Sequence, residues 1–267
     1  DEISQVGVQL WGHLALAKSK GVAMVLVGDF KQFPAINDHW HGVCLPGDSL
    51  ERSQLLHDLA GGARVELREN RRSDSRLFDF YSSLDVHCSP YQLQTTLQAA
   101  RARFPVRESF DQNEDSSVTH LVMPHRERLR LNREANLREY NRRSSSNNGG
   151  SLFVPAVQEE VPNAPQDMWV WPGLRLIGAG GPCHRGCFCH VESVDDSGIK
   201  LVVVRDPLPK EHASKYLCLS YAITYASCQG LTLKGRVRLH TRSPHFTCRH
   251  LYVGSSRATS ADLLEVL

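Results

Sequence analysis

A short apolar run near the start of the chain, residues 22–27, constrains the fold more than any other feature of the sequence. The run is unbroken and rich in β-branched residues, as in a parallel strand that is buried on both faces of an α/β sheet. Gly28 and Asp29 follow at the point where such a strand would end. Because ligands of open α/β sheets bind at the carboxyl ends of the strands, the stretch VLVGDFKQFP (25–34) predicts a binding site at this edge.

The first 150 residues alternate between helical and strand-like segments. We expect further strands at residues 65–67 and 118–123, and helices at residues 10–18, 77–84 and 125–143. The last of these helices carries opposite charges four residues apart, which stabilises a helix. Residues 144–150, SSSNNGG, have the composition of a loop.

Residues 152–212 have a different character, with prolines, tryptophans, glycines and short strand candidates at 174–177 and 199–204. The stretch DDSG (195–198) predicts a hairpin turn. We therefore expect a small β-barrel inserted into an α/β unit that resumes at residue 216.

The composition is that of a globular protein, with 41% hydrophobic and 22% charged residues among 267. This length exceeds one typical domain, and no apolar run approaches the roughly 18 residues of a membrane span. We expect the eight scattered cysteines to be reduced thiols of an intracellular protein, whose compartment (nucleus, mitochondrion or cytoplasm) the sequence does not reveal. Most of the 31 basic residues are arginines, which favours a phosphate-bearing partner.

Two short motifs carry residue types that nucleotide hydrolysis requires. In Asp1-Glu2, one carboxylate can hold Mg²⁺ and the other can deprotonate a water molecule, although Asp-Glu pairs are also common on solvated surfaces. After the tight turn at Gly28, the Gln32 amide can contact both a γ-phosphate and the attacking water, because it is donor and acceptor at once. The alternative is a plain turn in which Asp29 caps a helix.

Five motifs along the chain together resemble the superfamily 1B DNA helicases, most closely their PIF-like and RecD-like branch. Their order and spacing match that family over nearly the whole chain. The matching segments are Asp1-Glu2 (motif II), GDFKQFP at 28–34 (III), LRENRR at 67–72 (IV), QGLT at 229–232 (V) and YVGSSR at 252–257 (VI).

The resemblance implies RecA-like P-loop NTPase domains, the first incomplete, with a small inserted β-barrel. The implied divisions are the remainder of the first RecA-like domain (1–62), the first part of the second (63–150), the barrel (151–215) and the second part of the second (216–267). It also implies an ATP-dependent helicase that translocates on single-stranded DNA, binds duplex junctions and unwinds duplexes in DNA repair or recombination. We expect a monomer without a membrane segment.

The resemblance assigns roles to individual residues, with ATP and Mg²⁺ as cofactors. Glu2 would be the general base, Gln32 the γ-phosphate sensor, and Arg72 and Arg257 arginine fingers that stabilise transition-state charge. Asp1 would hold Mg²⁺ through water. The remaining implied contacts are Gly28, Asp29 and Gly230 for the nucleotide, and His125, Arg126, Asn132, Gln229 and Thr232 for nucleic acid. A buried turn would explain QGLT, and a solvated helix would explain the charges after His125.

The chain departs from the family pattern in several places. No G-x-x-x-x-G-K-[ST] occurs in the 267 residues, so we expect them to begin partway through the first RecA-like domain and to hydrolyse ATP poorly by themselves. Ala226-Ser227-Cys228 stands where relatives carry a His-Lys pair, and motif III has Phe33 and a single proline. The cluster CHRGCFCH (183–190) has no usual zinc-finger spacing, so we do not expect zinc there.

Two other functions remain open from the sequence. One is a catalytically inactive, helicase-derived module that binds nucleic acid. The other is an RNA helicase of the same superfamily.

Overall fold

A computed structural model describes residues 1–35, 38–40, 43–44, 49–107, 118–146, 150–158, 164–202, 204 and 206–267. Part of the expected 144–150 loop and one residue of the expected 199–204 strand lie outside these ranges. No helix in the described part of the chain is long and apolar enough to cross a bilayer.

A four-stranded parallel sheet forms the centre of the molecule, in the order β10-β3-β11-β12. Its strands are β3 (Thr119–Val122), β10 (Ala222–Thr224), β11 (Val237–Leu239) and β12 (Leu264–Val266). All of them pair in parallel and are buried, as expected for a sheet covered on both faces. The expected mixed α/β fold and the strand within 118–123 are confirmed.

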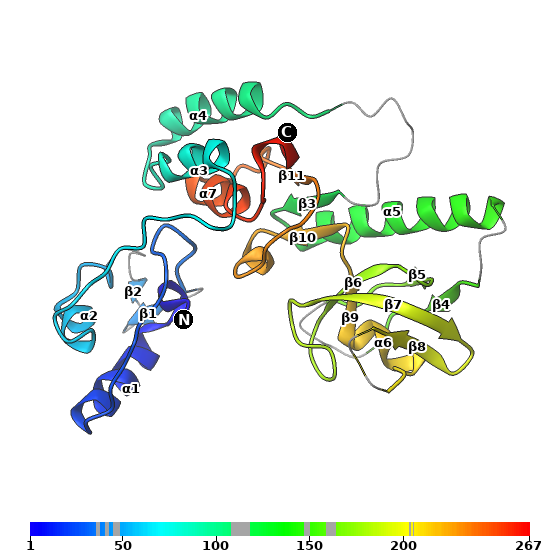
Figure 1. Cartoon of the computed structure of the whole chain (residues 1–267), viewed down its shortest axis with the longest axis horizontal. Helices are drawn as coiled ribbons and strands as arrows, with labels where there is room; N and C mark the ends of the chain where they lie inside the picture. The colour runs from blue at the N-terminus through cyan, green and yellow to red at the C-terminus, as the bar shows by residue number, and fades with distance from the viewer. Residues whose placement is uncertain are drawn as a thin grey trace.

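Helices cover this sheet and extend from it. In Figure 1, α3 (Ser75–Ser82), α4 (Pro90–Arg103) and α7 (Cys248–Ser255) gather beside β3 and β11. The long helix α5 (His125–Ser145) packs against β3, β10 and also β5, so it links the parallel sheet to the antiparallel part of the fold. The helices expected around 77–84 and 125–143 are therefore confirmed.

Antiparallel strands occupy the chain between α5 and β10. They are β4 (Leu152–Val154) with β5 (Met168–Val170), and the sheet β8-β7-β6-β9 built from β6 (Arg175–Gly178), β7 (Phe188–Asp195), β8 (Gly198–Leu201) and β9 (Leu217–Leu219). With α6 (Lys210–Tyr216) they surround one apolar core. The predicted hairpin at 195–198 joins β7 to β8, and the Asp195 carboxylate accepts hydrogen bonds from the Ser197 and Gly198 amides.

The N-terminal segment has its own small core around Trp11, Leu56 and Leu59. Its elements are η1 (Ile3–Gln5), α1 (Val8–Ser19), β1 (His39–Trp40), β2 (Val43–Cys44) and α2 (Gln54–Leu59). The helix expected at 10–18 is confirmed within α1.

Two predicted strands are wrong. Residues 22–27 and 65–67 form no strand, and Val25 and Leu67 are 88% and 85% exposed. Met24 and Leu26 are half-buried against the small core around Trp11. A buried parallel strand requires hydrogen-bonded neighbours along its edges. Among the described residues, the backbone of 22–27 bonds only at its two ends: the Val22 amide donates to the Ala17 carbonyl at 3.2 Å, and the Ile3 amide, at the start of η1, donates to the Val27 carbonyl at 3.1 Å.

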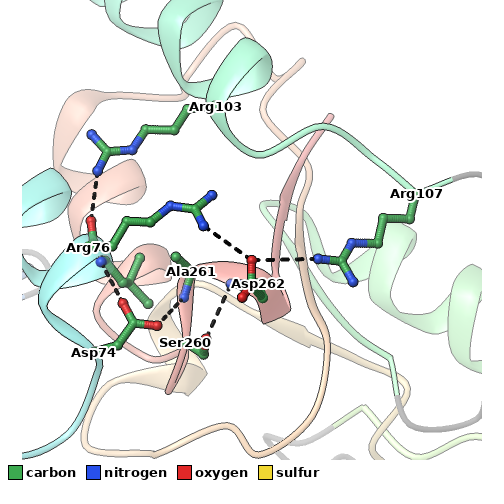
Figure 2. Close-up of polar contacts among 8 residues, drawn as sticks. Asp74, Arg76, Arg103, Arg107, Ser260, Ala261 and Asp262 are labelled. Atoms are coloured by element: carbon green, nitrogen blue, oxygen red, sulfur yellow. Dashed lines mark hydrogen bonds and ion pairs between the residues drawn. The ribbon is translucent and has the colours of Figure 1, made fainter.

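Asp74 joins the start of α3 to the C-terminal turn η3 (Ala261–Leu263), as Figure 2 shows. One carboxylate oxygen caps α3 by accepting from the Leu77 amide at 2.8 Å, and the other accepts from the Ala261 amide at 2.8 Å. Arg76 adds an ion pair to Asp262 at 3.2 Å. These contacts fix residues 70–74 beside the segment that follows Arg257.

Candidate functional site

A cavity of about 610 Å³ lies where the loop after residue 28 meets α7. It gathers side chains from three segments far apart in the sequence. The polar lining includes Asp29, Gln32, Asn70, Arg72, Thr232, Tyr252, Ser256 and Arg257. Four of the predicted motifs, III to VI, therefore contribute to one concave surface.

The loop at Gly28 approaches the N-terminal residues very closely. A Cβ atom at Gly28 would lie 2.7 Å from the Ile3 nitrogen, so a larger residue would push these two segments apart. Glu2 adopts a left-handed backbone conformation, with φ of 56°. The structure thus places motif II beside motif III, as the sequence predicts.

The same loop is attached to α7 by polar contacts. The Tyr252 hydroxyl donates to Asp29 Oδ2 at 2.6 Å, and Arg249 donates to the carbonyl oxygens of Phe30 and Gln32. Burial, and then the nearby Asp29 carboxylate, raise the pKa of Tyr252, which keeps the hydroxyl protonated as a donor. Sequence reasoning assigned no role to Tyr252 or Arg249. The available signal in the sequence was their spacing, because residues three apart lie on one face of a helix.

Arg257 is the most deeply buried cation of the cavity, with only 2% of its surface exposed. It donates to the Val253 carbonyl, to Ser256 Oγ and, at 3.5 Å, to the Leu231 carbonyl. Burial lowers the pKa of Arg257, and repulsion from Arg72 lowers it further. Arg72 is exposed and lines the same cavity, so the two predicted fingers lie together.

Gln32 is buried, and its Oε1 atom has no hydrogen-bonding partner among the described residues. Glu2 faces the turn of motif V, because a Cβ atom at Gly230 would lie 3.9 Å from Glu2 Oε1. Glu2 also raises the pKa of Arg257, after the effects of burial and of other neighbours. The predicted sensor and finger therefore line one cavity, and the predicted base lies beside the motif V turn, close enough to Arg257 to affect its pKa.

Gln229 lines a different cavity, of about 530 Å³, together with Phe33, Tyr225 and His250. Its Nε2 atom is buried and has no partner among the described residues. Burial, and then Arg249, lower the pKa of His250 to about 4, so this ring is neutral near pH 7. Within motif V, Thr232 therefore lines the 610 Å³ cavity, whereas Gln229 lines the 530 Å³ cavity.

The predicted nucleic-acid contacts on α5 separate into two groups. His125 and Arg126 are exposed in the first turn. Asn132 is fully buried, and its amide donates to the Ala222 carbonyl at 2.9 Å and accepts from the Ala222 amide at 2.8 Å. The prediction of a phosphate contact is therefore wrong for Asn132, because both ends of its amide hold α5 against β10.

The carboxylates of Asp1 and Glu2 and the polar side chains of the 610 Å³ cavity are of the types that bind Mg²⁺ and a nucleotide. Mg²⁺ binds through one or two carboxylates, and phosphate oxygens and water complete its shell. Asp1 is exposed, and one of its carboxylate oxygens already accepts from the Glu2 amide at 2.8 Å. The unpartnered Gln32 oxygen and the two arginines are polar groups that fit a phosphate chain and its attacking water.

The cysteine cluster after residue 182 does not assemble around one point. Cys183 and Cys189 are buried, whereas Cys187 and His190 are exposed. Within the described ranges, no three Cys, His, Asp or Glu side chains converge as metal ligands.

Comparison with known proteins gives matches among solved structures alone. No protein-family model and no curated protein matches the sequence. Pif1 helicase from Candida albicans is similar over the whole chain and 70% of that protein's chain, with a TM-score of 0.64 and 18% identity. Bacteroides Pif1 bound to single-stranded DNA is similar with a TM-score of 0.60 and 16% identity. Pif1 from Bacteroides in complex with ADP-AlF3 and single-stranded DNA is similar with a TM-score of 0.55 and 16% identity. Each of these two matches covers the whole of this chain and 69% of the other. The fold that the resemblance implies is confirmed: along its whole length, this chain folds like the Pif1 helicases.

Proposed function

We propose that these residues belong to an ATP-driven DNA helicase that translocates on single strands and unwinds duplexes. One observation carries the proposal: Gln32, Arg72 and Arg257, from three separate segments, line one cavity. Phosphoryl transfer depends on positioning and on stabilising charge, and these are the side-chain types that it uses. The neighbours of known structure are Pif1 helicases; one of them is a complex with ADP-AlF3 and single-stranded DNA, and another is bound to single-stranded DNA.

In this proposal each residue acts through its position. Gln32 orients the attacking water with its free amide oxygen, and Glu2 accepts the proton of that water. Arg257 exchanges its long contact with the Leu231 carbonyl for a phosphate oxygen, while Arg72 approaches from the exposed side. Asp1 would hold Mg²⁺ through water, and the ion would supply positive charge beside the phosphate oxygens. His125 and Arg126 contact the strand, and the motif V turn connects strand and nucleotide.

The test is ATP hydrolysis stimulated by single-stranded DNA, measured for these 267 residues and for the chain extended upstream to its gene's own start. We expect Arg257→Ala to lower turnover about 10³-fold in the active form, as the loss of an arginine finger does. The matched control is Arg133→Gln, an exposed arginine on α5 outside both cavities. Turnover of the Arg257 variant within about twofold of wild type would contradict the assignment.

A nucleic-acid-binding module without catalysis is the second candidate. The observation in its favour is that the 267 residues contain no G-x-x-x-x-G-K-[ST]. DNA binding without hydrolysis in either form would support it. Unwinding of RNA in preference to DNA duplexes would instead indicate an RNA helicase.

A further inference from the structure

A third cavity, distinct from the two cavities described above, lies at the joint between α5, the antiparallel strands and the parallel sheet. Its volume is about 280 Å³, roughly nine times the 30 Å³ share of one water molecule in the liquid. Its walls come from the second half of α5, from the segment 171–175 that enters β6, and from the Ser220-Tyr221 connection between β9 and β10. The proposed helicase roles use none of these residues.

The charged lining is strongly unbalanced. Three guanidinium groups, of Arg142, Arg143 and Arg175, face one carboxylate, of Glu139, so the lining carries a net charge of +2. The carboxylate is already bound to Arg142 at 2.5 Å. Arg143 lies over the Trp171 ring, 5.4 Å from its centre, a contact that attracts the cation without neutralising it.

Arg175 is the most unusual of the three cations. It donates to Thr119 Oγ1 at 2.7 Å and to Ser220 Oγ at 3.2 Å, which uses two of its five N–H donors. The guanidinium group also lies over the Phe188 ring, 4.9 Å from its centre, so its partners among the described residues are two hydroxyl groups and an aromatic ring. None of these is a carboxylate, and burial lowers the pKa of Arg175. A desolvated cation without a counter-charge is costly unless an anion completes its surroundings.

The Tyr221 side chain provides an independent observation. It is 7% exposed, lines the cavity, and its hydroxyl group has no hydrogen-bonding partner among the described residues. Asn136 lies nearby, and its amide is bonded to the backbone of Trp169 at 2.8 Å through both Nδ2 and Oδ1. Asn136 has only a second N–H left to offer the Tyr221 oxygen, an interaction that lowers the pKa of Tyr221, so it supplies no acceptor for the Tyr221 O–H. Burial, and then the Glu139 carboxylate, raise the pKa of Tyr221, so the group is a neutral O–H donor that lacks an acceptor.

We propose that this cavity binds a phosphate group, held by Arg143, Arg175 and the Tyr221 hydroxyl. Arginine matches phosphate through paired N–H donors, and a net charge of +2 suits a phosphate of charge near −2 better than a carboxylate. Because the lining comes from both sides of the joint, an occupant fixes the antiparallel strands relative to the parallel sheet. The phosphate comes either as a free ion or as a nucleic-acid backbone, and the experiment separates these two sources.

The experiment is calorimetric titration of the 267-residue chain with inorganic phosphate, at ionic strength held constant with chloride. We expect saturable binding that Arg143→Gln and Tyr221→Phe each weaken at least about fivefold, the effect of losing one charge-assisted contact. Arg133→Gln removes the same charge from an exposed position on the same helix, and it should bind as wild type does. Tyr221→Phe should melt in chloride no earlier than wild type, because the Tyr221 O–H has no acceptor among the described residues to lose.

The second arm measures binding of a labelled single-stranded oligonucleotide to the same variants by fluorescence anisotropy. Oligonucleotide binding weakened at least about fivefold by Arg143→Gln, but not by Arg133→Gln, identifies the nucleic-acid backbone as the source. Phosphate binding that responds to the variants while oligonucleotide binding does not identifies the free ion. Equal binding by wild type, Arg143→Gln and Tyr221→Phe in both arms, or no binding in either, overturns the proposal.

Discussion

At the scale of single residues, Asn132 and Arg126 lie six positions apart on α5 but differ in burial, because Asn132 is fully buried and Arg126 is exposed. Asn132→Ala removes both hydrogen bonds to Ala222 and leaves a buried N–H and C=O unpaired. We expect the free energy of unfolding to fall by about 2–4 kcal/mol, measured by urea denaturation. Arg126→Gln, an exposed change, should alter it by less than about 0.5 kcal/mol. Equal stability of the two variants would contradict the tether between α5 and β10.

At the scale of elements, Asp74 caps α3 and also binds the C-terminal turn. Asp74→Ala should lower the free energy of unfolding by about 1–2 kcal/mol, as the loss of an N-cap does. Asp79→Ala is the matched control, because Asp79 is an exposed carboxylate on the same helix away from the cap. Urea denaturation of both variants measures the difference, and similar losses would show that the cap contributes nothing specific.

The Asp74 contacts also predict a dependence on pH. Burial by itself would raise the pKa of Asp74, but hydrogen bonds with Ser260 and with the Leu77 and Ala261 amides outweigh it and lower the pKa. The contribution is therefore present above the ordinary pKa near 4 and is lost as the pH falls through the lower folded value. Wild type should lose stability on acidification more steeply than Asp74→Ala. Parallel pH profiles of the two proteins would contradict this.

At the scale of the whole molecule, the loop 29–33 attaches the N-terminal segment to α7. Tyr252→Phe removes the hydroxyl that donates to Asp29. We expect hydrogen exchange of the amides at 28–33 to become about tenfold faster, and exchange in β3 and β11 to stay unchanged, because a hydrogen bond to a charged group is lost only at the attachment. Tyr81→Phe is the control, since the Tyr81 hydroxyl pairs with Ser73, outside this loop. Unchanged exchange in Tyr252→Phe would show that other contacts hold the loop.

The sequence by itself determined several local elements and three of the side chains that line the 610 Å³ cavity. Charge spacing in α5, the turn residues at 195–198 and the apolar run at 118–123 each act over a few neighbouring residues, so they could be predicted. The order of the motifs likewise indicated that Gln32, Arg72 and Arg257 would meet, which the cavity bears out as a matter of position.

Only the tertiary structure decided which apolar segments become strands and which polar residues are buried. Residues 22–27 and 65–67 have strand composition, yet a strand also needs hydrogen-bonding partners along its edges, and composition carries no information about these. Asn132 is polar on a charged helix, and only the position of Ala222 makes it a buried tether. The three arginines beside Tyr221 converge because distant segments pack together, and unbalanced charge of this kind arises from packing rather than from local sequence.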